Sequence, residues 1–104
     1  EIPLTYALGS PPLVNSADET GIAGEVAADI VGEEQVMREI APIMGGEDFA
    51  YMLENAPGSY VWIGQADDEH QAPVHNPLYD FNDAILPVAT SYMARLVERQ
   101  LPRD

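Results

Sequence analysis

Segments with helical and with extended patterns alternate along this 104-residue chain, and the alternation limits the folds open to it. After an extended segment over 2–8 and a break at residues 9–12, the pattern predicts five further elements. These are a helix over 16–32, a strand over 36–41, a short helix over 49–55, a buried strand over 59–64 and a long helix starting at Asn82 or Asp83. Such alternation favours helices layered on a sheet. We therefore predict an α/β fold with a mixed sheet and packed helices.

The two longer helices carry the clearest local signals. Ser16 and Glu19 match a capping box, and Gly32 is placed to end the first helix. Between them, apolar side chains recur at helical spacing: Ile22, Ala23, Val26, Ala27, Ile30 and Val31. In the last helix we predict an apolar stripe of Leu86, Ala89, Met93, Leu96 and Val97. Residues 59–64 are continuously apolar, as central strands are.

Composition excludes several classes of partner. Eighteen acidic residues face four arginines, which gives a formal charge of −14, and such a field repels nucleic acid and anionic membranes. No apolar run approaches the roughly 20 residues that a membrane helix needs. The absence of cysteine removes disulfides and thiolate metal sites. We expect no nucleic-acid or membrane partner and a cytoplasmic location. Because the chain begins at Glu1, without methionine, we also expect it to be a piece of a longer chain.

His75 is the candidate for chemistry, because Pro73 and Pro77 stiffen the loop around it. A fixed imidazole suits a metal site or a general base, and Asp80 lies near enough in sequence to orient its other ring nitrogen. A histidine in a proline-rich turn also occurs as a plain surface or packing residue, so the residues alone leave both roles open. His70, in an acidic loop, is expected to be exposed.

Gly45 and Gly46 form the second candidate site, because they directly precede the short helix. Glycines there free the backbone to turn its amides toward a carboxylate or phosphate. Glu47 and Asp48 would oppose an anion unless their side chains turn away. An ordinary helix start with acidic first-turn residues is the alternative.

Three motifs in order resemble one family: residues 44–50 (Met-Gly-Gly-Glu-Asp-Phe-Ala), 57–64 (Pro-Gly-Ser-Tyr-Val-Trp-Ile-Gly) and 75–83 (His-Asn-Pro-Leu-Tyr-Asp-Phe-Asn-Asp). They are similar to the C-terminal part of metal-dependent amidohydrolases of the aminoacylase and carboxypeptidase family. That family includes hippurate hydrolases, N-acyl-amino-acid hydrolases and auxin-conjugate hydrolases. The resemblance implies that residues 1–10 end an inserted lid domain and its hinge. It implies that residues 11–104 are the C-terminal part of a zinc-peptidase-like catalytic domain.

The resemblance also implies a chemistry. His75 matches the late ligand of a site for two divalent ions, zinc, manganese or cobalt, with Asp80 as its orienting partner and with the amides of Gly45 and Gly46 facing the substrate's carboxylate. The substrate would be a small N-acyl amino acid of the hippurate type, hydrolysed at its amide bond. The family's other ligands and its general-base glutamate come earlier in the chain, so the isolated 104 residues are expected to be inactive.

The expected partners are the rest of the parent chain and, through the lid domain, a second copy. The alternative function is a non-catalytic acidic interaction domain that retains the fold. The upstream sequence would separate the two, because only an enzyme requires the family's earlier metal ligands.

Overall fold

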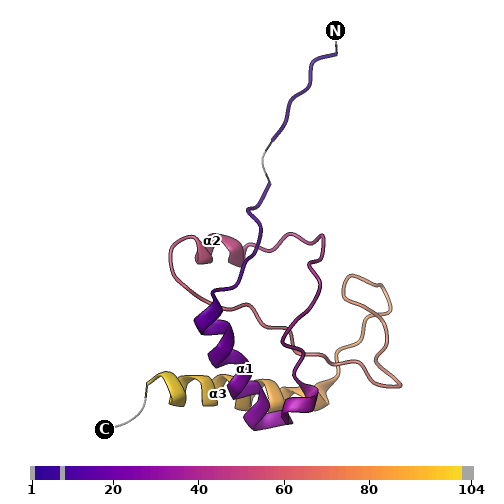
Figure 1. The fold of residues 1–104 in the computed structure, drawn as a ribbon. Helices are drawn as coiled ribbons and strands as arrows, with labels where there is room; N and C mark the ends of the chain where they lie inside the picture. Colours follow the sequence, from indigo (N-terminus) through magenta and orange to yellow (C-terminus); the bar gives the residue numbers. More distant parts are fainter. Residues whose placement is uncertain (1, 8, 102–104) are drawn as a thin grey trace.

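The computed structural model describes residues 2–7 and 9–101, and within them the regular elements are helices (Figure 1). The α-helices are α1 (Ala17–Val31), α2 (Phe49–Leu53) and α3 (Leu86–Gln100). Two 3₁₀ helices, η1 (Glu33–Gln35) and η2 (Asp83–Ile85), follow α1 and precede α3. Residues 2–7 extend away from the helices, and the remaining segments are irregular.

A small core lies where α1 crosses α3 (Figure 1). Ala23 and Val26 of α1 pack with Tyr92 of α3, and Val26 is 1% exposed. Partly buried side chains surround this centre: Ala27, Ile30 and Leu96. Arg99 of α3 also pairs with Glu25 and Asp29 of α1, although such exposed pairs add little stability.

The predicted mixed sheet is wrong: the described residues contain helices and no strand. Residues 2–7, 36–41 and 59–64 all lack strand pairing, and Leu8 of the first expected strand lies outside the described residues. A strand exists only when its backbone N–H and C=O groups bond to a neighbouring strand. Here the backbone of Tyr60 bonds instead to the side chain of Asn15.

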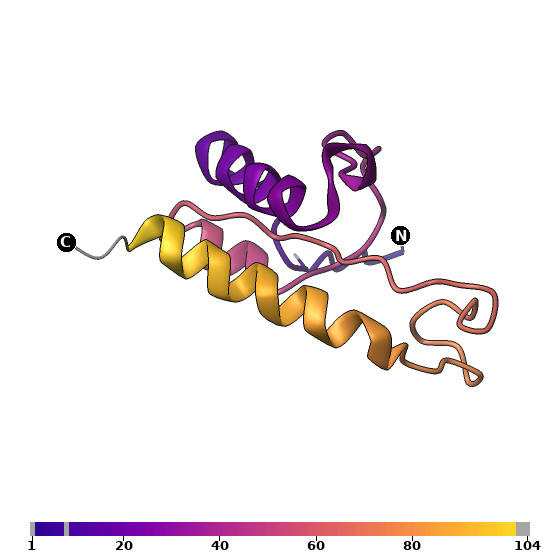
Figure 2. The same ribbon diagram turned by 90° about the horizontal axis from the view of Figure 1, so that it is seen from below.

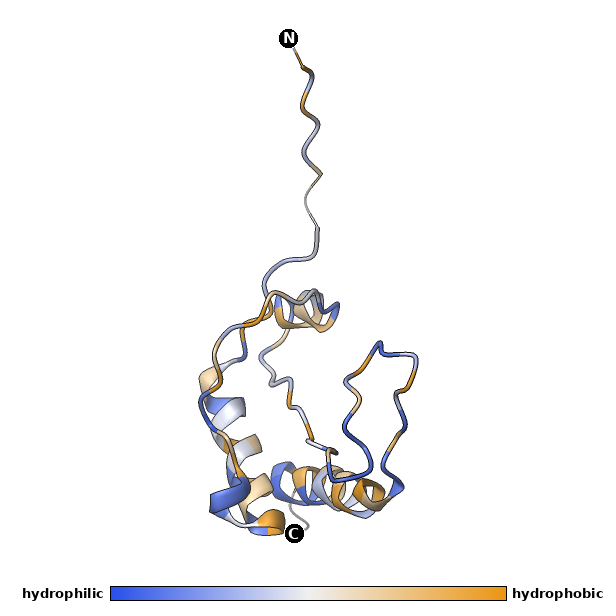
Figure 3. Ribbon diagram, turned by 90° about the vertical axis from the view of Figure 1, so that its right-hand side faces the viewer, coloured by the Kyte–Doolittle hydropathy of each residue, from blue (hydrophilic) through white to orange (hydrophobic). Residues whose placement is uncertain are grey.

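The apolar pattern of residues 59–64 predicts burial, but the burial is incomplete. Val61, Trp62 and Ile63 are 40%, 58% and 39% exposed. Figure 3 shows apolar residues along the irregular segments as well as on the helices. The apolar run therefore indicated a tendency to be covered, but in the described part of the chain no strand lies beside residues 59–64, and they form none themselves.

The predicted first helix is confirmed, with one difference at its start. Gly32 ends α1 with a φ of 89°, a backbone angle that glycine adopts without strain. Ser16 is the N-cap residue, but its hydroxyl accepts a hydrogen bond from the Gly58 amide (3.1 Å) rather than from the helix. The Ser16 amide in turn donates to the Gly58 carbonyl (2.9 Å). This reciprocal pair ties the start of α1 to the segment that follows α2.

The last helix is also confirmed, but its apolar residues lie on two faces rather than one. Tyr92 and the partly buried Leu96 face α1. Met93 and Val97, which the sequence placed in the same stripe, are 64% and 58% exposed. Among the described residues, no helix is both long enough and apolar enough to cross a membrane.

Candidate functional site

His75 sits in a tight turn at a backbone angle that non-glycine residues rarely adopt. The Asn76 amide donates to the Pro73 carbonyl (3.2 Å), so residues 73–76 form a β-turn with His75 in its third position. The φ of His75 is 66°, and no other non-glycine residue in the described ranges has a positive φ. A left-handed conformation costs an L-residue roughly 1–2 kcal/mol. The surrounding structure therefore holds His75 in place, with its side chain exposed.

A second turn follows directly and shares Asn76 with the first. The Tyr79 amide donates to the Asn76 carbonyl (2.9 Å), and the Leu78 amide donates to Asn76 Oδ1 (2.8 Å). Pro77 occupies the second position, where its fixed φ favours the turn. The stiff loop that the prolines predict thus consists of two consecutive turns after Pro73.

Residues 65–82, which we call the histidine loop, are closed at their base by side chains. Gln65 Nε2 donates to the Asp80 carbonyl (3.2 Å), while Gln65 Oε1 accepts from the Tyr79 hydroxyl (3.3 Å) and the Asn82 amide (3.1 Å). Asn82 Nδ2 donates to the Gln65 carbonyl (3.0 Å) and to Asp67 Oδ2 (2.9 Å). We call this set of five residues the neck. Figure 2 shows the loop continuing beyond the N-terminal end of α3.

His70 lies next to the neck and is less exposed than expected, with 20% of its side chain accessible. Its Nδ1 lies 2.8 Å from Asp67 Oδ1, which also accepts the amides of Glu69 (2.9 Å) and His70 (2.8 Å). The His70 amide, followed by its ring, lowers the pKa of Asp67 from 3.8 to about 2. The hydrogen bond to Asp67 raises the pKa of His70.

Asp80 is placed in the neck through its backbone. Its carbonyl accepts from Gln65, and its side chain is exposed. Within the described ranges no hydrogen bond joins the Asp80 carboxylate to His75. The orienting role of Asp80 stays a prediction.

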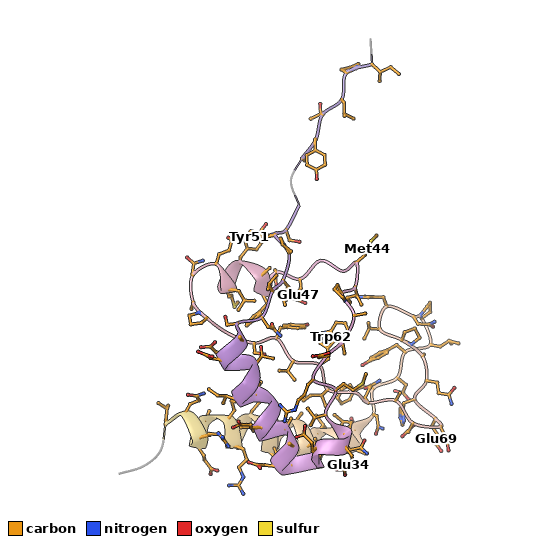
Figure 4. All side chains as sticks on the ribbon, viewed as in Figure 1. Glu34, Met44, Glu47, Tyr51, Trp62 and Glu69 are labelled. Carbon is orange, nitrogen blue, oxygen red and sulfur yellow. The ribbon has the colours of Figure 1, made fainter. Side chains whose placement is uncertain are left out.

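Gly45 and Gly46 lie in an exposed loop before α2, which we call the glycine loop (residues 44–48). Because α2 has only five residues, its dipole attracts an anion only weakly. The Glu47 side chain turns back: Oε1 accepts from the Phe49 amide (3.3 Å) and Oε2 from the Tyr60 hydroxyl (3.0 Å). The Phe49 amide, then Tyr60, lowers the pKa of Glu47. In Figure 4 Met44 points away from the molecule.

The Glu47 carboxylate of the glycine loop is therefore held by Phe49 and Tyr60, whereas Asp48 is exposed. The Phe49 and Tyr60 rings support this arrangement, with centroids 5.6 Å apart. No hydrogen bond between described residues links the glycine loop to the histidine loop. Each candidate site is thus ordered by its own local contacts.

A metal centre needs more ligands than these residues provide. The described part of the chain has no group of three or more histidine, cysteine, aspartate or glutamate side chains that could hold an ion. An imidazole suits zinc, manganese or cobalt as one ligand, and His75 is exposed to accept such a role. Among the described residues, His75 is thus a candidate for one ligand position, and no complete centre is formed.

Sequence reasoning missed the neck and the contact between Glu47 and Tyr60. Asn82 was expected to cap the long last helix, but it caps η2, which precedes α3: its Oδ1 accepts the Ala84 amide (3.0 Å), and the N-cap residue of α3 is Ile85. Asn82 also bonds to Gln65, 17 positions away, and to Asp67, 15 positions away, and no periodic sequence pattern predicts such pairs. The one available signal was that Gln65 is the first polar residue after a long apolar segment.

Comparison with known proteins identifies the family. The model of peptidase family M20/M25/M40 matches residues 1–99, and the chain therefore belongs to this family. The resemblance drawn from the three motifs is thereby confirmed at the level of the family.

The chain is similar to several curated hydrolases. It is 36% identical over 92 residues to IAA-amino acid hydrolase ILR1-like 2 of Arabidopsis thaliana, covering 88% of this chain and 21% of that protein. It is 35% identical over 92 residues to putative amidohydrolase YhaA of Bacillus subtilis, covering 86% and 23%. It is 31% identical over 101 residues to hippurate hydrolase of Campylobacter jejuni, covering 97% and 26%.

The chain thus spans about a fifth to a quarter of the length of these relatives. No solved structure matches it significantly.

Proposed function

We propose that this chain is the C-terminal part of a metal-dependent amidohydrolase that cleaves the amide bond of N-acyl amino acids. The observation that carries the proposal is the match of residues 1–99 to a hydrolase family, together with an exposed histidine held at a φ of 66°. Strained, over-determined conformations gather at functional sites. The relatives include a hippurate hydrolase and an IAA-amino acid hydrolase, which support N-acyl amino acids as the substrate class.

In this proposal His75 is one ligand of a centre for two divalent ions, zinc, manganese or cobalt. The remaining ligands and the general base come from outside this chain. Such ions polarise a carbonyl and lower the pKa of water, which is the chemistry that amide hydrolysis needs. Asp80 is proposed to influence the orientation of His75 from the base of the same loop.

Gly45 and Gly46 are proposed to face the substrate's carboxylate with their amides. The exposure of these glycines supports this role, and Glu47 is held by the Phe49 amide and the Tyr60 hydroxyl. The role also requires the exposed Asp48 carboxylate to point away from the substrate, because it would otherwise repel the substrate's carboxylate. We further propose that the parent enzyme is cytoplasmic. We also propose that it binds a second copy of itself through a lid domain.

The test uses the full-length protein. It should hydrolyse hippurate-like substrates when a divalent metal is supplied, and the isolated 104-residue chain should not, because the other ligands are missing. Turnover by the isolated chain that survives repurification and is lost in His75→Ala would contradict the proposal. A full-length sequence without further metal ligands would favour the acidic interaction domain instead.

A further inference from the structure

The neck connects the tip of the histidine loop to the helical core. Asn82 is 8% exposed and uses all of its side-chain groups: Nδ2 bonds to Gln65 and Asp67, and Oδ1 accepts the Ala84 amide. It therefore fixes the base of the loop to η2, which leads directly into α3. Because α3 packs on α1, the base of the loop is joined to the most buried part of the described chain.

From the neck to His75 the backbone has little freedom. Tyr79 and Asp80 are bonded to Gln65, and Tyr79 also ends the turn that begins at Asn76. Asn76 ends the preceding turn, whose third residue is His75. Each step from α3 to His75 is thus a turn or a hydrogen bond to a fixed neighbour. Such continuity can transmit the position of Asn82 to the imidazole.

We propose that Gln65 and Asn82 are positioning residues that set the orientation of His75 toward its metal ion. This inference rests on the proposed function, because it assumes that His75 is a ligand. Neither residue needs to touch the ion. Groups bonded directly to a metal ligand typically change metal affinity by about 10- to 100-fold when they are replaced. Gln65 and Asn82 would act through the backbone of the loop, so we expect an effect near the lower end of that range.

Asn82→Asp separates positioning from helix capping. Aspartate caps a helix start as well as asparagine does, so the bond from the Ala84 amide is retained. Aspartate cannot donate to the Gln65 carbonyl, and it sets a carboxylate against Asp67. Gln65→Ala removes the bonds to Tyr79, Asp80 and the Asn82 amide without altering the cap.

Gln71→Ala is the matched control. Gln71 lies in the same loop and donates to the Asp68 carbonyl (3.2 Å), outside the neck. The experiment measures the Kd of the full-length protein for Mn²⁺ and Co²⁺, the visible spectrum of bound Co²⁺, and the melting temperature. His75→Ala is measured beside these variants.

We expect Asn82→Asp and Gln65→Ala to bind both ions at least about tenfold more weakly and to alter the Co²⁺ spectrum, because the ligand is less well oriented. Asn82→Asp loses two hydrogen bonds and places a carboxylate beside Asp67, so its melting temperature should fall, and its metal binding is compared on samples with a native circular dichroism spectrum. Gln71→Ala should match the unsubstituted protein in metal affinity, Co²⁺ spectrum and melting temperature. A role in capping alone predicts instead that Asn82→Asp binds both ions as tightly as the unsubstituted protein does, and that result would overturn the inference.

His75→Ala tests the ligand role of His75 separately from the positioning role of Gln65 and Asn82. If it keeps its full metal content, the ligand assignment is wrong and the positioning role is overturned with it. If it loses metal while Asn82→Asp or Gln65→Ala binds within twofold of the unsubstituted protein, the positioning role of that residue alone is overturned.

Discussion

The side chain of Asn15 pairs with the backbone of Tyr60 in both directions. The Tyr60 amide donates to Asn15 Oδ1 (2.8 Å), and Asn15 Nδ2 donates to the Tyr60 carbonyl (2.9 Å), across 45 residues of sequence. A neighbouring strand would satisfy the same two groups in a sheet. The carboxamide thus gives this apolar segment a fixed neighbour where no strand supplies one in the described residues.

Asn15→Ala should lower the free energy of unfolding of the 104-residue chain by about 1–2 kcal/mol, because two partly buried hydrogen bonds are lost. Asn15→Asp keeps the acceptor and loses the donor, so its loss should be smaller. Asn55→Ala is the control, because Asn55 makes one exposed bond within its own helix end (2.8 Å to the Tyr51 carbonyl). Urea unfolding measures all three. An Asn15→Ala midpoint equal to that of Asn55→Ala would show that the pair contributes nothing.

The contact between Asn15 and Tyr60 illustrates why only part of the fold could be predicted from the sequence. The helices at Ala17–Val31 and Leu86–Gln100 were predicted because helical periodicity and caps are local. The prediction of a strand at residues 59–64 was wrong because a strand requires a neighbouring strand, which can lie far away in the sequence. For the site, Pro73 and Pro77 predicted a stiff loop at His75, but the positive φ and the neck arise from contacts that spacing does not encode.

Asp67 and His70 should make stability depend on pH at both ends of the range. The pKa of Asp67 is lowered from 3.8 to about 2, so its contribution is present above about pH 4 and is lost as the pH falls toward 2. The pKa of His70 is raised above 6.5, so its contribution is present below that value and is lost as the pH rises through the raised pKa.

Urea midpoints measured from pH 2 to pH 9 test this dependence. His70→Gln should flatten the slope above pH 6.5, and Asp67→Asn should flatten both slopes, because each pKa shift depends on the same hydrogen bonds. Asp68→Asn, one residue away, should leave the profile intact. Identical profiles for Asp67→Asn and Asp68→Asn would refute the coupling.

The outer face of α3 should cause the isolated chain to associate. Leu86, Met93 and Val97 are at least half exposed on this helix, and Trp62, in the irregular segment before the histidine loop, is 58% exposed. Exposed apolar groups of this kind promote association. Light scattering should show species larger than the monomer as concentration rises, and Met93→Glu with Val97→Glu should reduce them. A monomer that binds no hydrophobic dye at high concentration would contradict this expectation.

His75→Gly and His75→Ala should differ in stability and have the same effect on metal binding. Glycine adopts a φ of 66° without strain, so His75→Gly should keep or raise the free energy of unfolding. Alanine keeps the Cβ that makes this angle costly, and the two variants should differ by about 1 kcal/mol. If His75 is a ligand, both should lose metal from the full-length protein, because metal binding requires the neutral imidazole.

A packing role predicts a different pair of results. Both variants would then lose stability through the missing ring, by roughly 1 kcal/mol, while metal content stayed full. Measuring bound metal and melting temperature on the same samples separates the two roles, with circular dichroism to verify the fold. Full metal and near-normal kcat in His75→Gly would end the ligand assignment, because this substitution removes the imidazole while leaving the turn unstrained.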